Sequence, residues 1–385
     1  MATAAGRFIG GTILLFFSVF ALLPTFADDG ASAAEKAAAA RRAIDKVNRH
    51  WQKTHPPRAR YGWTDAVYHA GNIEAFFLTG DEAYLAHSLA WAEHNQWKGA
   101  KCDDRTKWKR VYGETDEYVL FADNQACFQT YADLNRIDPD PRKLRRAREV
   151  MEHQMSLPLD DFWHWSDALF MGMPVMTKLY KATGDETYLR KLREYVEYAD
   201  SIMYDDATGL YFRDAKYVWP KHKTPNGKKD FWSRGNGWVL AGLAKVLQDL
   251  PKDCESRPFF LDKFRRMARA VAACQSPGGW WSRSLHDPEF APRPESSGTA
   301  LFLYGLAWGI NNDTLNGKEF RPVAEKAWKF LSQTALQPDG MVGYVQPIGE
   351  RAIPGERVDA KSTGSFGVGC FLLAACEYVR LCERR

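Results

Sequence analysis

The stretch Ala300-Leu-Phe-Leu-Tyr-Gly-Leu-Ala-Trp-Gly-Ile310 is apolar on nearly every face when it is wound as a helix. A helix that is hydrophobic all round is buried on all sides. Its glycines and alanines let neighbouring backbones approach closely. The stretch therefore predicts an inner helix that is enclosed by other helices.

Two kinds of helix alternate along the chain. Segments rich in charge, such as Arg190-Lys-Leu-Arg-Glu-Tyr-Val-Glu-Tyr198, are amphipathic and present one face to water. The charged segments are 34–53, 81–97, 142–156, 185–203, 257–275 and 319–335, and the apolar segments are 65–79, 120–134, 167–181, 236–249, 297–311 and 363–380. Strand patterns are limited to 211–213 and 343–346. This alternation predicts stacked helical hairpins.

An internal repeat supports the hairpins. Leu78-Thr-Gly-Asp-Glu-Ala-Tyr-Leu85 recurs as Ala182-Thr-Gly-Asp-Glu-Thr-Tyr-Leu189, and in each copy the Gly ends one helix and the Asp caps the next. Six hairpins that close on themselves make an (α/α)6 barrel, whereas an open solenoid needs polar terminal caps. The last helix is apolar, which favours closure. We therefore expect an all-α fold, with 28–385 as a single barrel domain.

The N-terminus has the features of a secretory signal peptide. Arg7 precedes the apolar run 9–26, and small residues precede a plausible cleavage point after Ala27. We expect 1–27 to be removed and the mature protein to be exported, to the periplasm or outside the cell; an uncleaved anchor is the alternative. No other segment reaches the ~18 apolar residues that span a bilayer, so no stable membrane association is expected after cleavage.

The net charge and the spacing of the cysteines limit which partners and cofactors the protein is expected to bind. The net charge of +4 is spread along the chain and gives no reason to expect nucleic acid as a partner. Seven cysteines include no CxxC and no metal-ligand spacing, so we expect no metal and no cofactor. Cys370 and Cys376 lie in an apolar helix and are expected to be buried thiols. The oligomeric state is left open.

In a barrel of hairpins, the loops that enter the inner helices gather at one end, and unusual residues of this chain lie there. Asp167 follows Phe162, Trp163 and Trp165, which places a carboxylate among aromatic rings. A proton donor needs a raised pKa, whereas a helix start lowers it. A second carboxylate nearby raises it again, and Asp123 is the candidate. For both residues, a helix N-cap is the alternative.

A second unusual stretch is Phe231-Trp-Ser-Arg-Gly-Asn-Gly-Trp238. Arg234 has a planar fork that suits a carboxylate, and a structural role at helix C-termini is its alternative. Each of the tryptophans of this stretch and of the stretch before Asp167 is expected either to stack on a sugar ring or to pack in the core. The long connection 211–235 is a candidate wall or lid. The candidate substrate-binding residues are Arg234, Trp232, Trp238, Asn236, Trp163, Trp165, Trp63 and Asp65.

Through Trp165-Ser-Asp-Ala-Leu-Phe-Met171, Phe231–Trp238 and the pair Asp123-Asn124, the chain resembles glycoside hydrolase family 105, the unsaturated rhamnogalacturonyl hydrolases, which are related to the unsaturated glucuronyl hydrolases of family 88. The resemblance implies an (α/α)6 barrel that removes a 4,5-unsaturated uronic acid from the non-reducing end of lyase-generated oligosaccharides. It implies hydration of the C4=C5 bond, with Asp167 as proton donor, Asp123 as its partner and Arg234 at the uronate pocket.

One position departs from the family. Relatives often have a His after a Gly-Leu-Phe-Tyr-like turn, whereas here Gly209-Leu-Tyr-Phe212 is followed by Arg213, which becomes a candidate substrate-binding residue. The alternative functions are another (α/α)6 carbohydrate enzyme, either a conventional glycosidase or an epimerase, and a non-catalytic helical scaffold that binds glycans or protein.

Overall fold

The structure, a computed structural model, describes Met1 and residues 30–384, so the predicted signal peptide lies, apart from Met1, outside the described residues. Most of the described chain is helical. The outer helices are α1 (Ala33–Thr54), α3 (Glu82–His94), α5 (Pro141–Ser156), α8 (Thr187–Met203), α10 (Arg257–Ala273) and α12 (Gly317–Phe330). The inner helices are α2 (Trp63–Thr79), α4 (Cys127–Ile137), α6 (Ala168–Met171) with α7 (Met173–Thr183), α9 (Ser233–Asp249), α11 (Ser296–Asn311) and α13 (Ser365–Glu383).

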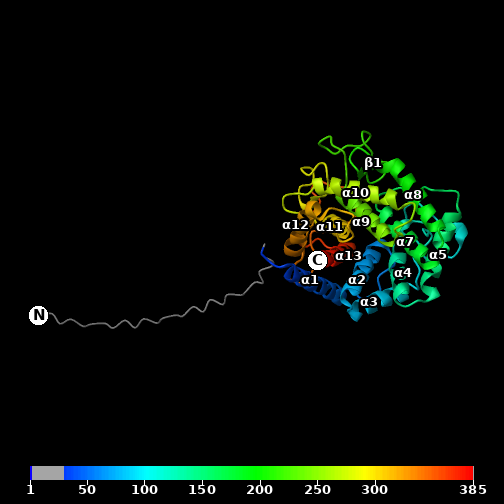
Figure 1. Ribbon diagram of the computed structural model, residues 1–385, viewed down its shortest axis with the longest axis horizontal. Coiled ribbons are helices and arrows are strands. Elements are labelled where there is room, and N and C mark those ends of the chain that lie inside the picture. Colours follow the sequence, from blue (N-terminus) through cyan, green and yellow to red (C-terminus); the bar gives the residue numbers. More distant parts are fainter. Residues whose placement is uncertain (2–29, 385) are drawn as a thin grey trace.

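The inner helices form a closed ring. In order, α2 packs against α4, α4 against α7, α6 and α7 against α9, α9 against α11, α11 against α13, and α13 against α2. Five hairpins join neighbours in sequence, whereas the sixth pairs α13 with α1, so the two ends of the described chain complete the barrel (Figure 1). The predicted (α/α)6 barrel is confirmed, and the open solenoid is wrong.

The barrel core is built from the apolar inner helices. Every residue of α11 from Ser296 to Ile310 is buried, as its sequence predicts. A Cβ atom at Gly369 would lie 2.2 Å from the Val67 carbonyl oxygen, so α13 and α2 approach closely because this residue is glycine. Helix α13 is long and apolar enough to cross a membrane, but 89% of that window is buried inside the barrel, as expected for a core helix.

The helix boundaries explain where the functional side chains lie. The inner helix expected at 120–134 begins only at Cys127, after the short 3-10 turn η2 (Ala122–Asn124). The helix expected at 167–181 is divided at Gly172, where a Cβ atom would lie 2.5 Å from Nε1 of Trp163. Helix α9 begins at Ser233, so most of the 231–238 stretch is its first turn and not a loop.

The repeated Gly-Asp pairs join helices as predicted, except that Asp81 is the N-cap of α3 whereas Asp185 lies one residue before Glu186, the N-cap of α8. Gly80 and Gly184 end α2 and α7 with φ of 71° and 73°, in the left-handed region that favours glycine. Asp81 and Asp185 each accept a hydrogen bond of 2.9 Å from a backbone N–H two residues later. Both junctions therefore turn an inner helix back into an outer one with the same local chemistry.

Strands are short among the described residues. β1 (Tyr204–Asp205) pairs antiparallel with β2 (Leu210–Tyr211), and β3 (Trp281–Ser282) with β4 (Pro294–Glu295). The strand expected at 343–346 is wrong, because its backbone N–H groups at 344 and 345 donate to loop carbonyls at 359 and 362. Two further short turns are the 3-10 helix η1 (Arg105–Lys107) and the π-helical η3 (Leu331–Ala335).

Candidate active site

A pocket of about 300 Å³ opens at the end of the barrel where the inner helices begin. Its walls come from the start of α2, from η2, from the residue before α6, and from loops near 112–114 and 348–349. The predicted gathering of helix starts at one end is therefore confirmed. Asp65, Asp123 and Asp167 line this pocket.

The backbone around Asp167 is held by the segment that follows β2. Ser166 N donates to the Arg213 carbonyl oxygen at 2.8 Å, and Trp165 forms an isolated antiparallel bridge with Asp214. Asp167 occupies the N-cap position of α6, yet its side chain makes no capping hydrogen bond. Instead its Oδ2 accepts from Ser166 Oγ at 3.1 Å. The interpretation of Asp167 as a mere cap is wrong.

Asp123 is likewise not a cap. It lies inside η2, whose N-cap position is Phe121. Within residues 30–384, no hydrogen bond reaches its carboxylate, although the side chain is largely buried. A carboxyl that serves neither a helix end nor an ion pair is available for chemistry in the pocket.

Burial raises the pKa of both carboxyls, and the charge of Asp167 adds to the rise at Asp123 only, so burial and not a second carboxylate raises the pKa of Asp167. The pKa of Asp123 rises from 3.8 to about 8, first because the group is buried and second because Asp167 is close, while Arg213 opposes the rise. Burial also raises the pKa of Asp167, against the opposing charges of Arg213 and Arg234. The helix start, which was expected to lower the pKa of Asp167, is outweighed by desolvation.

Arg213 brings a cation to the same pocket. Its Nε lies 4.0 Å from Asp167 Oδ2, and that N–H is buried without a hydrogen-bond partner in the described structure. The rest of its fork is held by Asp214 at 2.6 Å and Glu350 at 3.4 Å. Arg213 is thus positioned to stabilise negative charge beside the two carboxyls.

Trp165, Trp63 and Asp65 also line the pocket, as predicted. The Trp165 ring stacks on Phe121 with ring centroids 4.6 Å apart and 20° between the planes. Burial raises the pKa of Asp65 as well, so the pocket holds three perturbed carboxyls.

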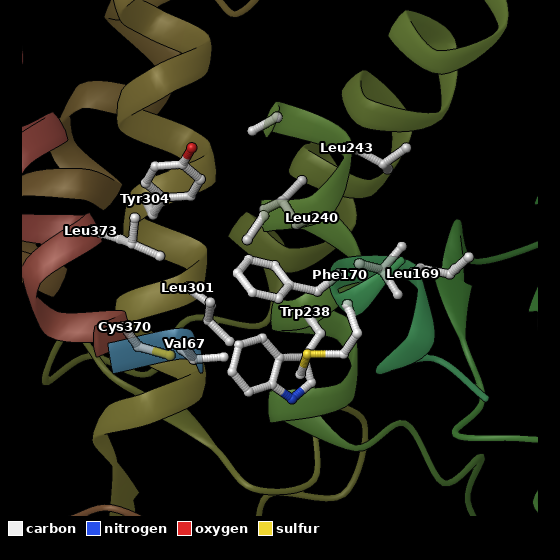
Figure 2. Packing of buried hydrophobic residues seen from close by; sticks show 14 of the residues in the cluster. Val67, Leu169, Phe170, Trp238, Leu240, Leu243, Leu301, Tyr304, Cys370 and Leu373 are labelled. Carbon is white, nitrogen blue, oxygen red and sulfur yellow. The ribbon is translucent and has the colours of Figure 1, made fainter. Parts of the chain in front are cut away.

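The other predicted substrate-binding residues are corrected by the structure. Trp163, Trp232 and Trp238 are at most 1% exposed, so they belong to the core and not to a sugar platform. Figure 2 shows Trp238 among Phe170, Leu240 and Leu301. These rings fill the space between inner helices, where water and sugar do not enter.

Asn236 and Arg234 have structural partners. The Asn236 amide holds β2, since it accepts from Tyr211 N and donates to Tyr211 O, both at 2.9 Å. Arg234 is 1% exposed, and its fork donates to the carbonyl oxygens of Gln346 at 2.7 Å and Pro347 at 2.8 Å. It does not line the pocket; it anchors the 346–349 segment that does, and its charge acts on Asp167 from a distance.

Sequence reasoning missed the rim of the pocket. Tyr112 and Ile348 line it and are 65% and 68% exposed. Arg60 and Glu114 also line it. Tyr112, an aromatic residue in a charged loop, offered a weak signal, whereas Ile348 offered none. Among residues 30–384, no group of three or more His, Cys, Asp or Glu side chains is arranged to hold a metal ion.

Comparison with known proteins shows which family the chain resembles. The chain matches the family model described as Glycosyl Hydrolase Family 88 over residues 36–382. It is 34% identical over 345 residues to an unsaturated 3S-rhamnoglycuronyl hydrolase of Formosa agariphila, covering 86% of this chain and 89% of that one.

Two solved structures are closely similar. A glycosyl hydrolase family 88 protein from Bacteroides vulgatus is 55% identical, with a TM-score of 0.88, covering 91% of this chain and 100% of that one. A protein named a polysaccharide lyase is 60% identical, with a TM-score of 0.89, covering 91% and 99%. The resemblance expected from the sequence is confirmed. The chain belongs to glycosyl hydrolase family 88.

Proposed function

We propose that this enzyme removes a 4,5-unsaturated uronic acid from the non-reducing end of oligosaccharides that polysaccharide lyases release. The relative from Formosa agariphila is named for such an activity. The observation that carries the proposal is the pair Asp123 and Asp167, two buried carboxyls with raised pKa that face one small pocket. Such a pair retains a proton at neutral pH, which a general acid needs.

The reaction is hydration of a vinyl ether. Asp167 donates a proton to C4, and positive charge develops at C5 and the ring oxygen. Water adds to C5 and returns its proton to the carboxylate. The resulting hemiketal opens to a C5 ketone, and the hemiacetal left at C1 releases the rest of the oligosaccharide. The relation between carboxylate separation and anomeric outcome therefore does not apply.

Asp123 holds the proton of the pair before the reaction, because with a pKa of about 8 it is mostly neutral at pH 7. It supplies this proton to Asp167, the donor to C4, and recovers it when the added water returns a proton to the pair. The bound uronate brings a further negative charge, which favours the protonated form of both carboxyls. As pH rises through about 8 the pair loses its proton, and turnover is expected to fall.

Two features of the pocket suit the uronate carboxylate. Arg213 presents a buried N–H without a hydrogen-bond partner in the described structure. Helix α2 begins in the pocket wall after Gly62, which offers no side chain to cap it. The Asp65 N–H donates to the Gly62 carbonyl oxygen at 3.1 Å, whereas the N–H groups of Trp63 and Thr64 are open to an anion. The small volume suits one terminal sugar ring, which agrees with removal from a chain end.

The test uses an unsaturated disaccharide and follows the enoate absorbance. We expect the absorbance to fall with the wild type, and Asp167→Asn to lose nearly all turnover while its circular dichroism spectrum is unchanged. Asp185→Asn, which alters a carboxylate that only caps α8, is the matched control and should retain activity. Persistent absorbance across several unsaturated uronides would refute the proposal.

One similar protein is named a polysaccharide lyase, and the same assay distinguishes lyase activity from the hydration proposed here. A lyase creates the C4=C5 bond, so absorbance would rise on a saturated uronide polymer. The site supports hydration of that bond and not its formation, because a lyase needs a base that removes the C5 proton, whereas the carboxyl pair retains a proton at neutral pH.

We also propose that the mature protein acts outside the cytoplasm, because residues 1–27 have the pattern of a signal peptide. Cell fractionation with N-terminal sequencing of the recovered protein tests this. Full-length protein in the cytoplasmic fraction would contradict it.

A further inference from the structure

The connection between β2 and α9 carries a basic loop, residues 215–229, that the proposed reaction does not use. It contains five lysines and one histidine and no acidic residue. A run of like charges is usually a solvated surface. Only the cations that have no partner in the described chain are available to bind a ligand.

Three of the lysines are paired. Lys216 lies 3.4 Å from Glu350, Lys228 lies 3.8 Å from Asp287, and Lys229 lies 2.6 Å from Asp205. Lys221 and Lys223 are exposed, and no ion pair or side-chain hydrogen bond from the described chain reaches either ammonium group. The basic loop thus presents two uncompensated cations to solvent.

An exposed indole lies beside Lys223. Trp219 is 37% exposed, and it is the one tryptophan of residues 30–384 that is neither buried nor half-buried. The Lys223 Nζ atom lies 4.8 Å from the centroid of its ring. A partly exposed aromatic ring beside the Lys223 cation has no packing role to explain it, and such rings mark binding surfaces.

The basic loop continues the wall of the pocket. Tyr217 Oη donates to Glu350 at 2.6 Å, and Glu350 follows Gly349, which lines the pocket. The Tyr217 ring contacts His222 with centroids 4.8 Å apart, which closes the base of the turn that carries Trp219. Trp219 is the second residue after Tyr217, a backbone reach of at most about 7 Å. An oligosaccharide that leaves the pocket on this side meets Trp219 next.

We propose that Trp219, Lys221 and Lys223 form a subsite for the reducing-end part of the substrate, and that this part carries carboxylate or sulfate groups. The indole provides a flat face for a sugar ring, and the two ammonium groups provide the charge for its anionic substituents. The inference rests on the proposed function, because it assumes that the unsaturated uronate occupies the pocket.

The first experiment compares kcat/KM for an unsaturated disaccharide, which ends before the subsite, with that for the tetrasaccharide of the same series. We expect Trp219→Ala and the double variant Lys221→Met/Lys223→Met to lower the tetrasaccharide value about tenfold and to leave the disaccharide value within about twofold. The double variant Lys53→Met/Lys252→Met, which removes two exposed lysines elsewhere on the surface, is the charge-matched control. Equal loss on both substrates, or no loss on either, would overturn the inference.

Two further experiments identify the anionic group that the lysines recognise and test binding at the subsite independently of turnover. Tetrasaccharides with and without sulfate esters show which group the lysines recognise, and the preference for the charged one should disappear in the double variant and at high salt. Calorimetric binding of the tetrasaccharide is measured in the Asp167→Asn background, where no turnover is required. If wild type fails on every disaccharide, the proposed function fails, and the binding arm still decides the subsite: tetrasaccharide affinity unchanged by Trp219→Ala overturns it.

Discussion

Replacing Asp123 by Asn is expected to abolish turnover and to stabilise the fold, by an amount that depends on pH. The pKa of Asp123 is raised from 3.8 to about 8 in the folded protein. Between about pH 4 and pH 8 the folded state therefore holds a proton that the unfolded state has lost. The wild type's free energy of unfolding falls as pH rises across this window.

The magnitude follows from the width of the window. Between pH 5 and the Asp123 pKa of about 8 lie about three pH units, and each contributes about 1.4 kcal/mol, so the contribution lost by pH 9 is about 4 kcal/mol. Because Asn does not ionise, the Asp123→Asn variant does not lose this contribution to its free energy of unfolding. Relative to wild type, Asp123→Asn should therefore gain about 4 kcal/mol between pH 5 and pH 9.

Urea unfolding of both proteins at pH 5 and pH 9 measures this difference, and groups that are not coupled to Asp123 cancel. Asp185→Asn is the control, because hydrogen bonds lower the pKa of Asp185 and its titration ends below this range. A stability difference between Asp123→Asn and wild type that is the same at both pH values would refute the burial and coupling argued for the pair.

Three further outcomes follow from other parts of the barrel. Arg213→Met removes the cation that lowers the pKa of Asp123 and Asp167, so the alkaline limb of the pH–rate profile should move to higher pH; an unmoved limb would count against this role. Lys245 is buried on α9, and burial lowers its pKa, so below pH 10 the folded state binds fewer protons than the unfolded state. Lys245→Met should raise Tm at pH 7, with an advantage that shrinks towards pH 10, and a lower Tm at pH 7 would contradict the reasoning. Gly369→Ala places a Cβ atom 2.2 Å from the Val67 carbonyl and should cost about 1–3 kcal/mol in urea unfolding; an unchanged midpoint would show that α2 and α13 separate easily.

The barrel fold could be predicted from the sequence, because the extent to which a helix is buried is reflected in its own amino-acid composition. A helix with one wet face is amphipathic, and a helix enclosed on all sides is apolar throughout, so α11 and α8 differ in composition before they are packed. The Gly-Asp junctions are equally local, since a left-handed C-cap and an N-cap depend on neighbouring residues. The position of Asp167 at a helix start followed from the same pattern, whereas Asp123 lies in η2, before α4 begins at Cys127.

The roles of individual rings and charges were decided only by tertiary contacts. Trp165 lines the pocket whereas Trp163, two residues earlier, is fully buried, and nothing in their local sequence distinguishes them. Arg234 finds its carbonyl partners 112 and 113 residues away, in a segment that no local pattern connects to it. The raised pKa of Asp123 has the same origin, because desolvation and the charge of Asp167 arise only when separate helix starts converge. Helix periodicity and capping depend on residues close in the sequence, so the sequence alone predicts them. The burial of a given side chain depends on distant parts of the chain, and so does the chemistry that burial confers.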